Sequence, residues 1–328
     1  MYFFNKEAYK EYLVENEIEN YEELLSNEKR YFEWTEKGEI ILEKTKGRKS
    51  KIDVTQYSSC IGWIILNDGE TMALIKNIFG DVYRDLNEKD YNISLYNNIL
   101  LPEIAIQLKN ESAQYYIAKR NPKDVRRYIL TLDFRNQKKL IHGTEILEET
   151  GNDINELRYE NLKYAIEDYL LENGYNMEDI DTIQMDFLKQ SIFGIITKQI
   201  DQHNRNWGLL LDEEKKRASI APLYDIDCSC GINKANKKQR KYKNGYSDIY
   251  SFLKEFKEEE WLPEYIEQII QNFDIRKAFC ESEKSTNTEI PNDIKEYYKT
   301  FFDQRMKELK EAKEKVFEGG NKEINIER

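Results

Sequence analysis

The sequence predicts an α+β fold in which a small antiparallel β lobe precedes a larger, mostly helical lobe. Runs of β-branched and aromatic residues, separated by turn residues, recur between residues 60 and 134. From about residue 140 onward, apolar residues recur at helical spacing instead. A chain of 328 residues has room for two lobes and a sizeable core. We therefore expect an N-terminal extension over residues 1–51, a small lobe over 52–135 and a helical lobe over 136–328.

The composition indicates a globular protein whose surface carries both signs of charge. Hydrophobic residues make up 40% of the chain and charged residues 34%, which is enough apolar material for a core. The net charge of −12 argues against a general nucleic-acid binder, because nucleic acid repels an acidic surface. A local basic run over residues 234–243 is either a solvated loop or a segment that meets phosphates or an acidic partner.

Apolar runs, cysteines and histidines further limit the classes of protein to which the chain can belong. No apolar run approaches the ~18 residues of a transmembrane helix, and the first residues lack the basic start and apolar core of a signal peptide. The four cysteines form no C-x-x-C pair, and two histidines are too few for a His-based zinc site. We expect a reduced, cytoplasmic protein; the alternative is an effector secreted without a classical signal peptide.

The extension over residues 1–51 is charged and rich in aromatic residues. Its first residues have rough helical spacing, and residues 30–43 favour a hairpin around Gly38. No side chain here indicates chemistry. We expect this extension to pack on the small lobe, or to act as an arm that docks a substrate.

The small lobe is predicted to begin with a hairpin of strands at 62–66 and 71–76. The second strand ends in Lys76, whose ammonium can reach nucleotide phosphates; the alternative is a solvated strand end. The preceding loop holds Ser58, Ser59 and Gly62 and could cover phosphates, but one glycine makes a weak phosphate-loop motif.

A helix with a broad apolar face follows, and Pro102 interrupts its pattern. Because proline is favoured at the first position of a helix, the spacing predicts a helix from Leu101 to Leu108 with Glu103 in its first turn. Glu103 can fix a strand lysine or simply complement the helix dipole. Strands at 114–119 and 127–134 would complete the small sheet. Lys119, also at a strand end, is a rival to Lys76.

The helical lobe is predicted to deliver the chain to one polar stretch. A helix from Leu157 ends at Asn173-Gly174, which is a good C-terminal stop. Asp181 or Thr182 can cap the next helix, whose apolar residues continue to Ile200. An apolar stripe from Ile294 to Leu309 indicates a long final helix that packs on the core.

Two short segments after the buried helix carry side chains suited to phosphoryl transfer. Asp201 precedes Asn206 by five residues, and Asp225 follows about twenty residues later, which suits a loop, a short hairpin and a return. One carboxylate can orient or deprotonate an attacking hydroxyl, while an amide oxygen and a second carboxylate hold Mg²⁺ against the phosphates. Isolated residues of this kind are usually turn formers, but the combination favours a catalytic site.

Two further residues of these segments are candidates. Asp227 is a second metal ligand; it would point to the opposite face from Asp225 if the strand-like segment at 219–224 continued. His203 can hydrogen-bond the backbone and fix the loop, and the alternative is a general base.

The motifs D-x-H-x-x-N-W-G at 201–208 and A-P-L-Y-D at 221–225 resemble the catalytic and metal-binding segments of HipA-like serine/threonine kinases. The segment from Phe134 to Leu147 also resembles the short stand-alone, CtkA-type members. This resemblance implies a two-lobed protein-kinase-like fold that binds ATP and Mg²⁺ and transfers the γ-phosphate to a protein Ser or Thr. It implies Asp201 as catalytic base, Lys76 as the ATP lysine, and metal ligation by Asn206 and Asp225.

The resemblance has further implications and some departures. Several members autophosphorylate a serine in the phosphate-covering loop, for which Ser58 and Ser59 are candidates by position. The loop lacks the family's Gly/Gln-rich pattern, and Asp227 adds a carboxylate. The expected partners are a protein substrate and an antitoxin or other regulatory protein. The alternatives are a small-molecule or lipid kinase, and a nucleotide-binding pseudokinase or interaction module.

Overall fold

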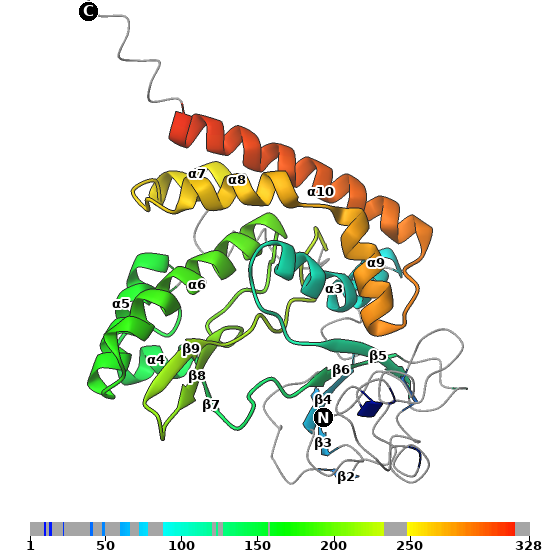
Figure 1. The fold of residues 1–328 in the computed structure, drawn as a ribbon, viewed down its shortest axis with the longest axis horizontal. Coiled ribbons are helices and arrows are strands. Elements are labelled where there is room, and N and C mark those ends of the chain that lie inside the picture. The colour runs from blue at the N-terminus through cyan, green and yellow to red at the C-terminus, as the bar shows by residue number, and fades with distance from the viewer. Residues whose placement is uncertain are drawn as a thin grey trace, which may run out of the picture. The chain divides into compact units, whose positions relative to one another are not determined.

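The computed structural model describes residues 88–119, 127–156, 158–232 and 248–318, four short strand segments before residue 78, and a few isolated residues. The chain divides into two compact units. The first comprises Met1–Pro102, Ala113–Phe134 and Ala278–Pro291, and the second comprises Glu103–Ser112, Arg135–Lys277 and Asn292–Arg328. The first unit contains the larger sheet together with helical residues, and helices dominate the described part of the second, as the predicted α+β class requires (Figure 1).

The first unit contains a six-stranded sheet in the order β1-β5-β6-β4-β3-β2 (Figure 1). Its neighbours pair antiparallel except β1 and β5, which are parallel. The edge strands β1 and β2 come from the first 51 residues, so this part of the chain extends the sheet at both ends. The strands are β1 (Ile40–Ile41), β2 (Arg48–Lys49), β3 (Cys60–Ile65), β4 (Met72–Asn77), β5 (Tyr115–Lys119) and β6 (Tyr128–Leu132).

The central strands follow the predicted pattern closely. β3 and β4 pair antiparallel with Trp63 opposite Leu74, and β5 and β6 form the second predicted pair. Because side chains alternate between the two faces of a strand, this register gathers one set of apolar residues on a single face. That buried cluster comprises Ala73, Ile75, Tyr116, Ala118, Tyr128 and Leu130.

The helix that carries Glu103 begins much earlier than its sequence predicts. Helix α3 spans Glu88–Gln107 with Pro102 inside it, so the prediction of a helix start at Leu101, with Glu103 in the first turn, is wrong. An internal proline costs about 3 kcal/mol, because it removes a backbone donor. Burial of each apolar side chain contributes about 1.5–3 kcal/mol, which outweighs that cost. The fully buried residues are Ile93, Leu95, Ile99, Leu100, Leu101 and Ile104.

The second unit contains a three-stranded antiparallel sheet in the order β7-β8-β9 (Figure 1). β8 (Gly208–Asp212) and β9 (Arg217–Ile220) form the short hairpin that the spacing between the two motifs predicts. β7 (Lys139–His142) pairs with β8 and leads into α4 (Gly143–Glu149). The sequence does not predict β7, because only four residues carry its pattern.

Two helices precede the polar stretch. α5 (Tyr159–Glu172) ends at Asn173, and Gly174 then adopts a φ of +72°, as the predicted stop requires. α6 (Met177–Ile196) begins before Asp181 and Thr182, so the prediction that one of them caps it is wrong. Asn176 is the cap, because its side chain accepts a hydrogen bond from the Glu178 N–H at 3.1 Å.

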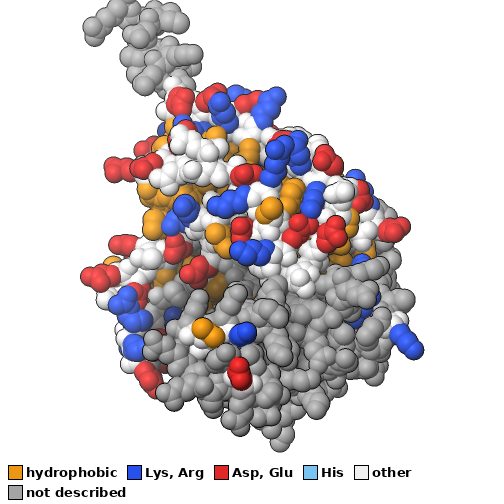
Figure 2. Space-filling view, turned by 45° about the vertical axis from the view of Figure 1, so that its right-hand side comes forward, with side chains coloured by type: hydrophobic (Ala, Val, Ile, Leu, Met, Phe, Trp, Pro, Cys, Tyr) orange, Lys and Arg blue, Asp and Glu red, His pale blue; other side chains and the backbone are white. Residues whose placement is uncertain are grey.

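The remaining helices are α7 (Ile249–Glu255), α8 (Leu262–Asn272), α9 (Ile275–Thr286) and α10 (Asn292–Lys313), followed by the π-turn η1 (Glu314–Glu318). Most of the predicted stripe of α10 is buried: Ile294, Tyr298, Phe302 and Leu309 are each at most 5% exposed, and Tyr297 and Phe301 are half-buried. Basic and acidic side chains alternate on the face shown in Figure 2. Within the described residues, every helix is too short or too polar to cross a membrane.

Candidate active site

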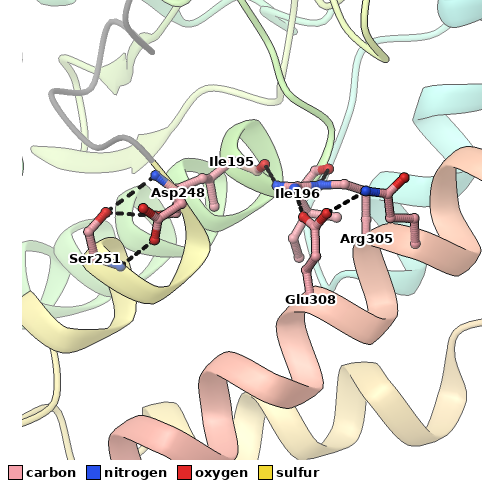
Figure 3. Close-up of polar contacts among 7 residues, drawn as sticks. Ile195, Ile196, Asp248, Ser251, Arg305 and Glu308 are labelled. Carbon is pink, nitrogen blue, oxygen red and sulfur yellow. Dashed lines mark hydrogen bonds and ion pairs between the residues drawn. The ribbon is translucent and has the colours of Figure 1, made fainter.

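Helix α6 leads into the polar stretch, and an arginine holds its carboxyl end. Arg305 of α10 is buried, and its guanidinium donates to the carbonyls of Ile195 and Ile196 at 2.5 and 2.9 Å (Figure 3). Glu308 pairs with the same guanidinium (Figure 3). The last carbonyls of a helix lack intrahelical partners and carry partial negative charge, so a cation stabilises them. This contact fixes the carboxyl end of α6, from which the segment with Asp201 continues.

The backbone turns sharply just after α6. Lys198 adopts a φ of +51°, and the Gln199 N–H donates to the Gly194 carbonyl at 2.9 Å, which closes the helix. Burial lowers the pKa of Lys198, and the positive charge of Arg305 lowers it further. The turn directs the chain toward Asp201.

The two predicted motif segments lie side by side and run antiparallel. Hydrogen bonds join residues 197–208 to residues 221–230. They include those from Cys230 N to Thr197 O at 2.6 Å, Ile200 N to Cys228 O at 2.9 Å, Tyr224 Oη to Arg205 O at 3.2 Å and Ala221 N to Gly208 O at 2.8 Å. The structure therefore brings Asp201 and Asn206 on one segment next to Asp225 and Asp227 on the other.

The loop between Asp201 and Asn206 is closed by its own hydrogen bonds. Asn206 Nδ2 donates to the Asp201 carbonyl at 2.7 Å, and the Asn206 N–H donates to the His203 carbonyl at 2.7 Å. The Nδ1 atom of His203 accepts from the Arg205 N–H at 3.3 Å. Because Nδ2 is engaged with Asp201, the Oδ1 atom of Asn206 is the atom available to a cation.

Sequence reasoning misses Asn204, which anchors the same loop to the rest of the unit. Its Nδ2 donates to the carbonyls of Ile154 and Glu156 at 2.9 and 2.7 Å, and its Oδ1 accepts from Trp207 Nε1 at 2.9 Å. The buried indole of Trp207 lies against Gly143, where an added Cβ would overlap it. The position of Asn204 inside the D-x-H-x-x-N-W-G motif is the available signal, but a turn-forming role explains it equally well from sequence.

Asp225 has an uncommon backbone conformation. Its φ is +55°, a region that L-residues other than Asn and Asp rarely occupy. Gln199, two residues before Asp201, donates its side-chain amide to the Asp225 carbonyl at 3.4 Å. Strained backbone of this kind clusters at functional sites, where the surrounding structure holds it in place.

The segment before Asp225 does not continue as a strand. β9 ends at Ile220, so the expectation that Asp225 and Asp227 alternate on a persisting strand does not apply. Pro222 has no N–H for a strand ladder, and the positive φ of Asp225 turns the chain. The side chain of Asp225 is half-buried, whereas Asp227 is only 4% exposed.

The other predicted residues lie elsewhere in the chain. Lys76, in β4, is opposite Ile129 of β6, which is opposite Ile117 of β5. Paired residues share a face and alternate along a strand, so Lys76 and Lys119 extend from the same face of the sheet. Both side chains are half-buried.

Four more candidates complete the set. Gly62 lies in β3 of the first unit, and Glu103 lies near the end of α3 in the second. Ser58 and Ser59 are outside the described residues, as is the basic run at 234–243. In the described part of the chain, no three His, Cys, Asp or Glu side chains form a metal-binding group. The candidate metal site therefore depends on the Asn206 amide in addition to carboxylates.

The two units and their sheets define a kinase-like α+β fold. A crystal structure of the Helicobacter pylori proinflammatory kinase CtkA matches with a TM-score of 0.57 and 16% identity over 79% of this chain and 95% of that chain. The model of the HipA-like C-terminal domain matches residues 49–278, and the chain belongs to this family.

Other comparisons are more distant. HipA of Shewanella oneidensis MR-1, solved with HipB and operator DNA as a toxin–antitoxin system, matches with a TM-score of 0.47 and 13% identity. That match covers 78% of this chain and 60% of the HipA chain. No curated protein matches the sequence significantly.

Proposed function

We propose that this protein is an ATP- and Mg²⁺-dependent serine/threonine protein kinase that transfers the γ-phosphate of ATP to a protein hydroxyl. The observation that carries the proposal is the antiparallel pairing of residues 197–208 with 221–230. This pairing supports one site built from a carboxylate, an amide and a second carboxylate held by strained backbone. Membership in the HipA-like family and the kinase-like fold agree with it.

The donor set fits Mg²⁺. Mg²⁺ prefers oxygen ligands, and the hydrogen bond from Asn206 Nδ2 to the Asp201 carbonyl orients the amide with its oxygen directed elsewhere. We assign Asn206 and Asp225 as the ligands and Asp227 as a further carboxylate of the same site. When bound, Mg²⁺ would neutralise charge that develops on the transferred phosphoryl group.

The remaining roles concern the substrates. Asp201 orients the acceptor hydroxyl and accepts its proton, and His203 holds the loop through its hydrogen bond with the Arg205 N–H. Lys76 contacts the phosphates and Glu103 positions it, with Lys119 as the alternative lysine. The segment that contains Ser58, Ser59 and the β3 residue Gly62 covers the phosphates, and one of its serines accepts a phosphate in autophosphorylation.

The partners follow from this chemistry. A protein with an accessible Ser or Thr is the substrate, and an antitoxin or other regulatory protein is proposed from the family alone. A small-molecule or lipid kinase would use the same site with a different acceptor, so the acceptor must be tested directly. A pseudokinase would bind the nucleotide without transferring phosphate.

The proposal is tested with degenerate peptide libraries whose acceptor is Ser, Thr or Tyr. We expect transfer of phosphate from ATP to the Ser or Thr libraries, only with Mg²⁺, and none to the Tyr library. Asp201→Asn is the matched control, because it preserves side-chain shape and removes the base. Nucleotide binding without transfer to any peptide or to the protein itself would contradict the proposal, and so would transfer to lipid or sugar alcohols alone.

A further inference from the structure

Three residues that are distant in sequence form a hydrogen-bonded chain beside the candidate site. His142 Nδ1 lies 2.8 Å from the hydroxyl oxygen of Tyr224, and that hydroxyl donates to the Arg205 carbonyl at 3.2 Å. The two rings meet edge to face, with centroids 5.8 Å apart. Tyr224 directly precedes Asp225 and Arg205 directly precedes Asn206. One hydroxyl group therefore joins the segments that carry both proposed metal ligands.

The direction of each hydrogen bond follows from the number of protons. A phenol has one hydrogen, and in Tyr224 it points to the Arg205 carbonyl. The Tyr224 oxygen must then accept from His142, which places a proton on Nδ1 of that imidazole. The chain consequently runs from His142 through Tyr224 to Arg205 without a gap.

His142 is held firmly by its own surroundings. It is the last residue of β7, opposite Gly208 of β8. Its N–H donates to Glu145 Oε2 at 2.7 Å in the first turn of α4. The hydrogen-bonded chain thus starts from an ordered strand end and reaches two loop segments.

The hydrogen bond of the Tyr224 hydroxyl lies between two main-chain hydrogen bonds that join the same segments. The main-chain bonds on either side of it are Ala221 N to Gly208 O and Ile200 N to Cys228 O. Both of these bonds are more residues away from Asn206 and Asp225 than the Tyr224 bond is. The side chain of Gln199 also reaches this region, because it donates to the Asp225 carbonyl at 3.4 Å, but the Tyr224 bond is the shorter of the two side-chain bonds.

We propose that Tyr224, supported by His142, is a positioning residue that sets the spacing between Asn206 and Asp225 so that both bind one Mg²⁺. This inference rests on the proposed function. Neither ring contacts substrate in this scheme. Partners that orient metal ligands from outside the coordination sphere typically change metal affinity by about 10- to 100-fold when they are lost.

The test is a Mg²⁺ titration at a fixed concentration of a non-hydrolysable ATP analogue. The variants are Tyr224→Phe, His142→Phe and the double substitution. Tyr159→Phe is the matched control, because the Tyr159 hydroxyl also donates to a backbone carbonyl of the second unit, that of Gln184 at 2.7 Å. Each variant keeps an aromatic ring at the substituted position, and circular dichroism and thermal unfolding verify that the fold is retained.

We expect Tyr224→Phe to raise the apparent Kd for Mg²⁺ about tenfold, with no change in analogue binding in EDTA. The double variant should bind Mg²⁺ no more weakly than Tyr224→Phe, because both residues act through one chain of hydrogen bonds. The Tyr159→Phe control should match the wild type.

Equal Mg²⁺ affinity in wild type and Tyr224→Phe would overturn the positioning role, and so would an equal loss in Tyr159→Phe. A wild-type protein that binds no Mg²⁺–nucleotide would instead contradict the proposed function. Amide hydrogen exchange would then test the connection independently of ligands. Tyr224→Phe must speed exchange in both 201–208 and 221–228, and unchanged exchange in these segments would overturn the inference.

Discussion

The side-chain amide of Asn206 donates a 2.7 Å hydrogen bond to the backbone carbonyl of Asp201, five residues earlier. This bond connects the proposed metal ligand to the proposed base. It closes the loop and also determines which atom of the amide is presented to a cation. The Asn206 side chain therefore both closes the loop and presents the oxygen proposed to bind the metal.

Substitution of Asn206 should separate these two effects. Asn206→Ala removes both the donor and the oxygen. We expect its free energy of unfolding to fall by about 1 kcal/mol and its Mg²⁺-dependent nucleotide binding to be lost. Asn206→Asp retains an oxygen for the metal but cannot donate, so it should lose stability while still binding Mg²⁺. Urea unfolding and calorimetric titration measure the two quantities. A stable Asn206→Ala variant with intact Mg²⁺ binding would contradict both roles.

The positive φ of Asp225 predicts that its glycine variant is more stable than its alanine variant. Asp225→Ala and Asp225→Gly both remove the carboxylate, but only alanine meets the steric cost of the left-handed region, about 1–2 kcal/mol. We expect the Gly variant to be more stable than the Ala variant by about 1 kcal/mol, with Mg²⁺-dependent binding lost in both. Chemical denaturation provides the comparison. An Ala variant as stable as the Gly variant would show that the conformation is not strained.

Asp179 should be important for stability although it lies outside the site. Its carboxylate is 5% exposed and accepts from Arg217 Nε and from the Ala218 N–H, each at 3.0 Å, which ties β9 to α6. We expect Asp179→Ala to lower the free energy of unfolding by about 2 kcal/mol, because these two bonds and the ion pair with Arg217 Nη2 at 2.7 Å are lost.

An exposed ion pair supplies the control for Asp179. Lys139 and Glu213 lie 3.2 Å apart with side chains that are 56% and 61% exposed. Glu213→Ala should cost less than about 0.5 kcal/mol, because solvent screens exposed pairs. Similar losses in both variants, measured by urea unfolding, would contradict the anchoring role of Asp179.

His142 predicts a dependence of stability on pH. Burial lowers its pKa from the ordinary 6.5, although the Glu145 carboxylate and a hydrogen bond to the Arg205 backbone act in the opposite direction. The unfolded chain therefore binds this proton more readily than the folded chain, and its contribution to stability is complete above pH 6.5 and falls as the pH drops through the folded pKa. We expect the stability difference between wild type and His142→Phe to shrink on acidification. A difference that does not change from pH 8 to pH 5 would contradict this.

The sequence predicts best where a local pattern coincides with a local structure. The hairpin of β3 and β4 follows from strand residues around a turn, and the end of α5 follows from Asn173-Gly174. Asp201, Asn206 and Asp225 were identifiable because each residue type suits one step of phosphoryl transfer at that spacing. Their function is still proposed from this chemistry.

Other features depend on contacts that a local pattern does not contain. Pro102 indicates a helix start, but burial along α3 overrides that signal. Strand residues after Gly38 indicate β1, but its parallel pairing with β5 depends on a partner that is distant in sequence. The roles of Asn204 and Tyr224 depend on carbonyls up to fifty residues away in sequence, at Ile154 and Arg205. Side-chain chemistry alone does not identify those partners.

Intact-mass spectrometry of the purified protein after incubation with Mg²⁺ and ATP, alongside Asp201→Asn, tests the proposed phosphoryl transfer most directly. We expect addition of phosphate to the wild type itself, or transfer of the γ-phosphate to an added protein substrate with release of ADP. Both rates should fall about 10²- to 10⁴-fold in the variant, because a positioned base contributes that much. Nucleotide binding should be unchanged, since Asp201 is not a proposed metal ligand. Equal rates in the two proteins would contradict the assignment of Asp201 and of the site around it.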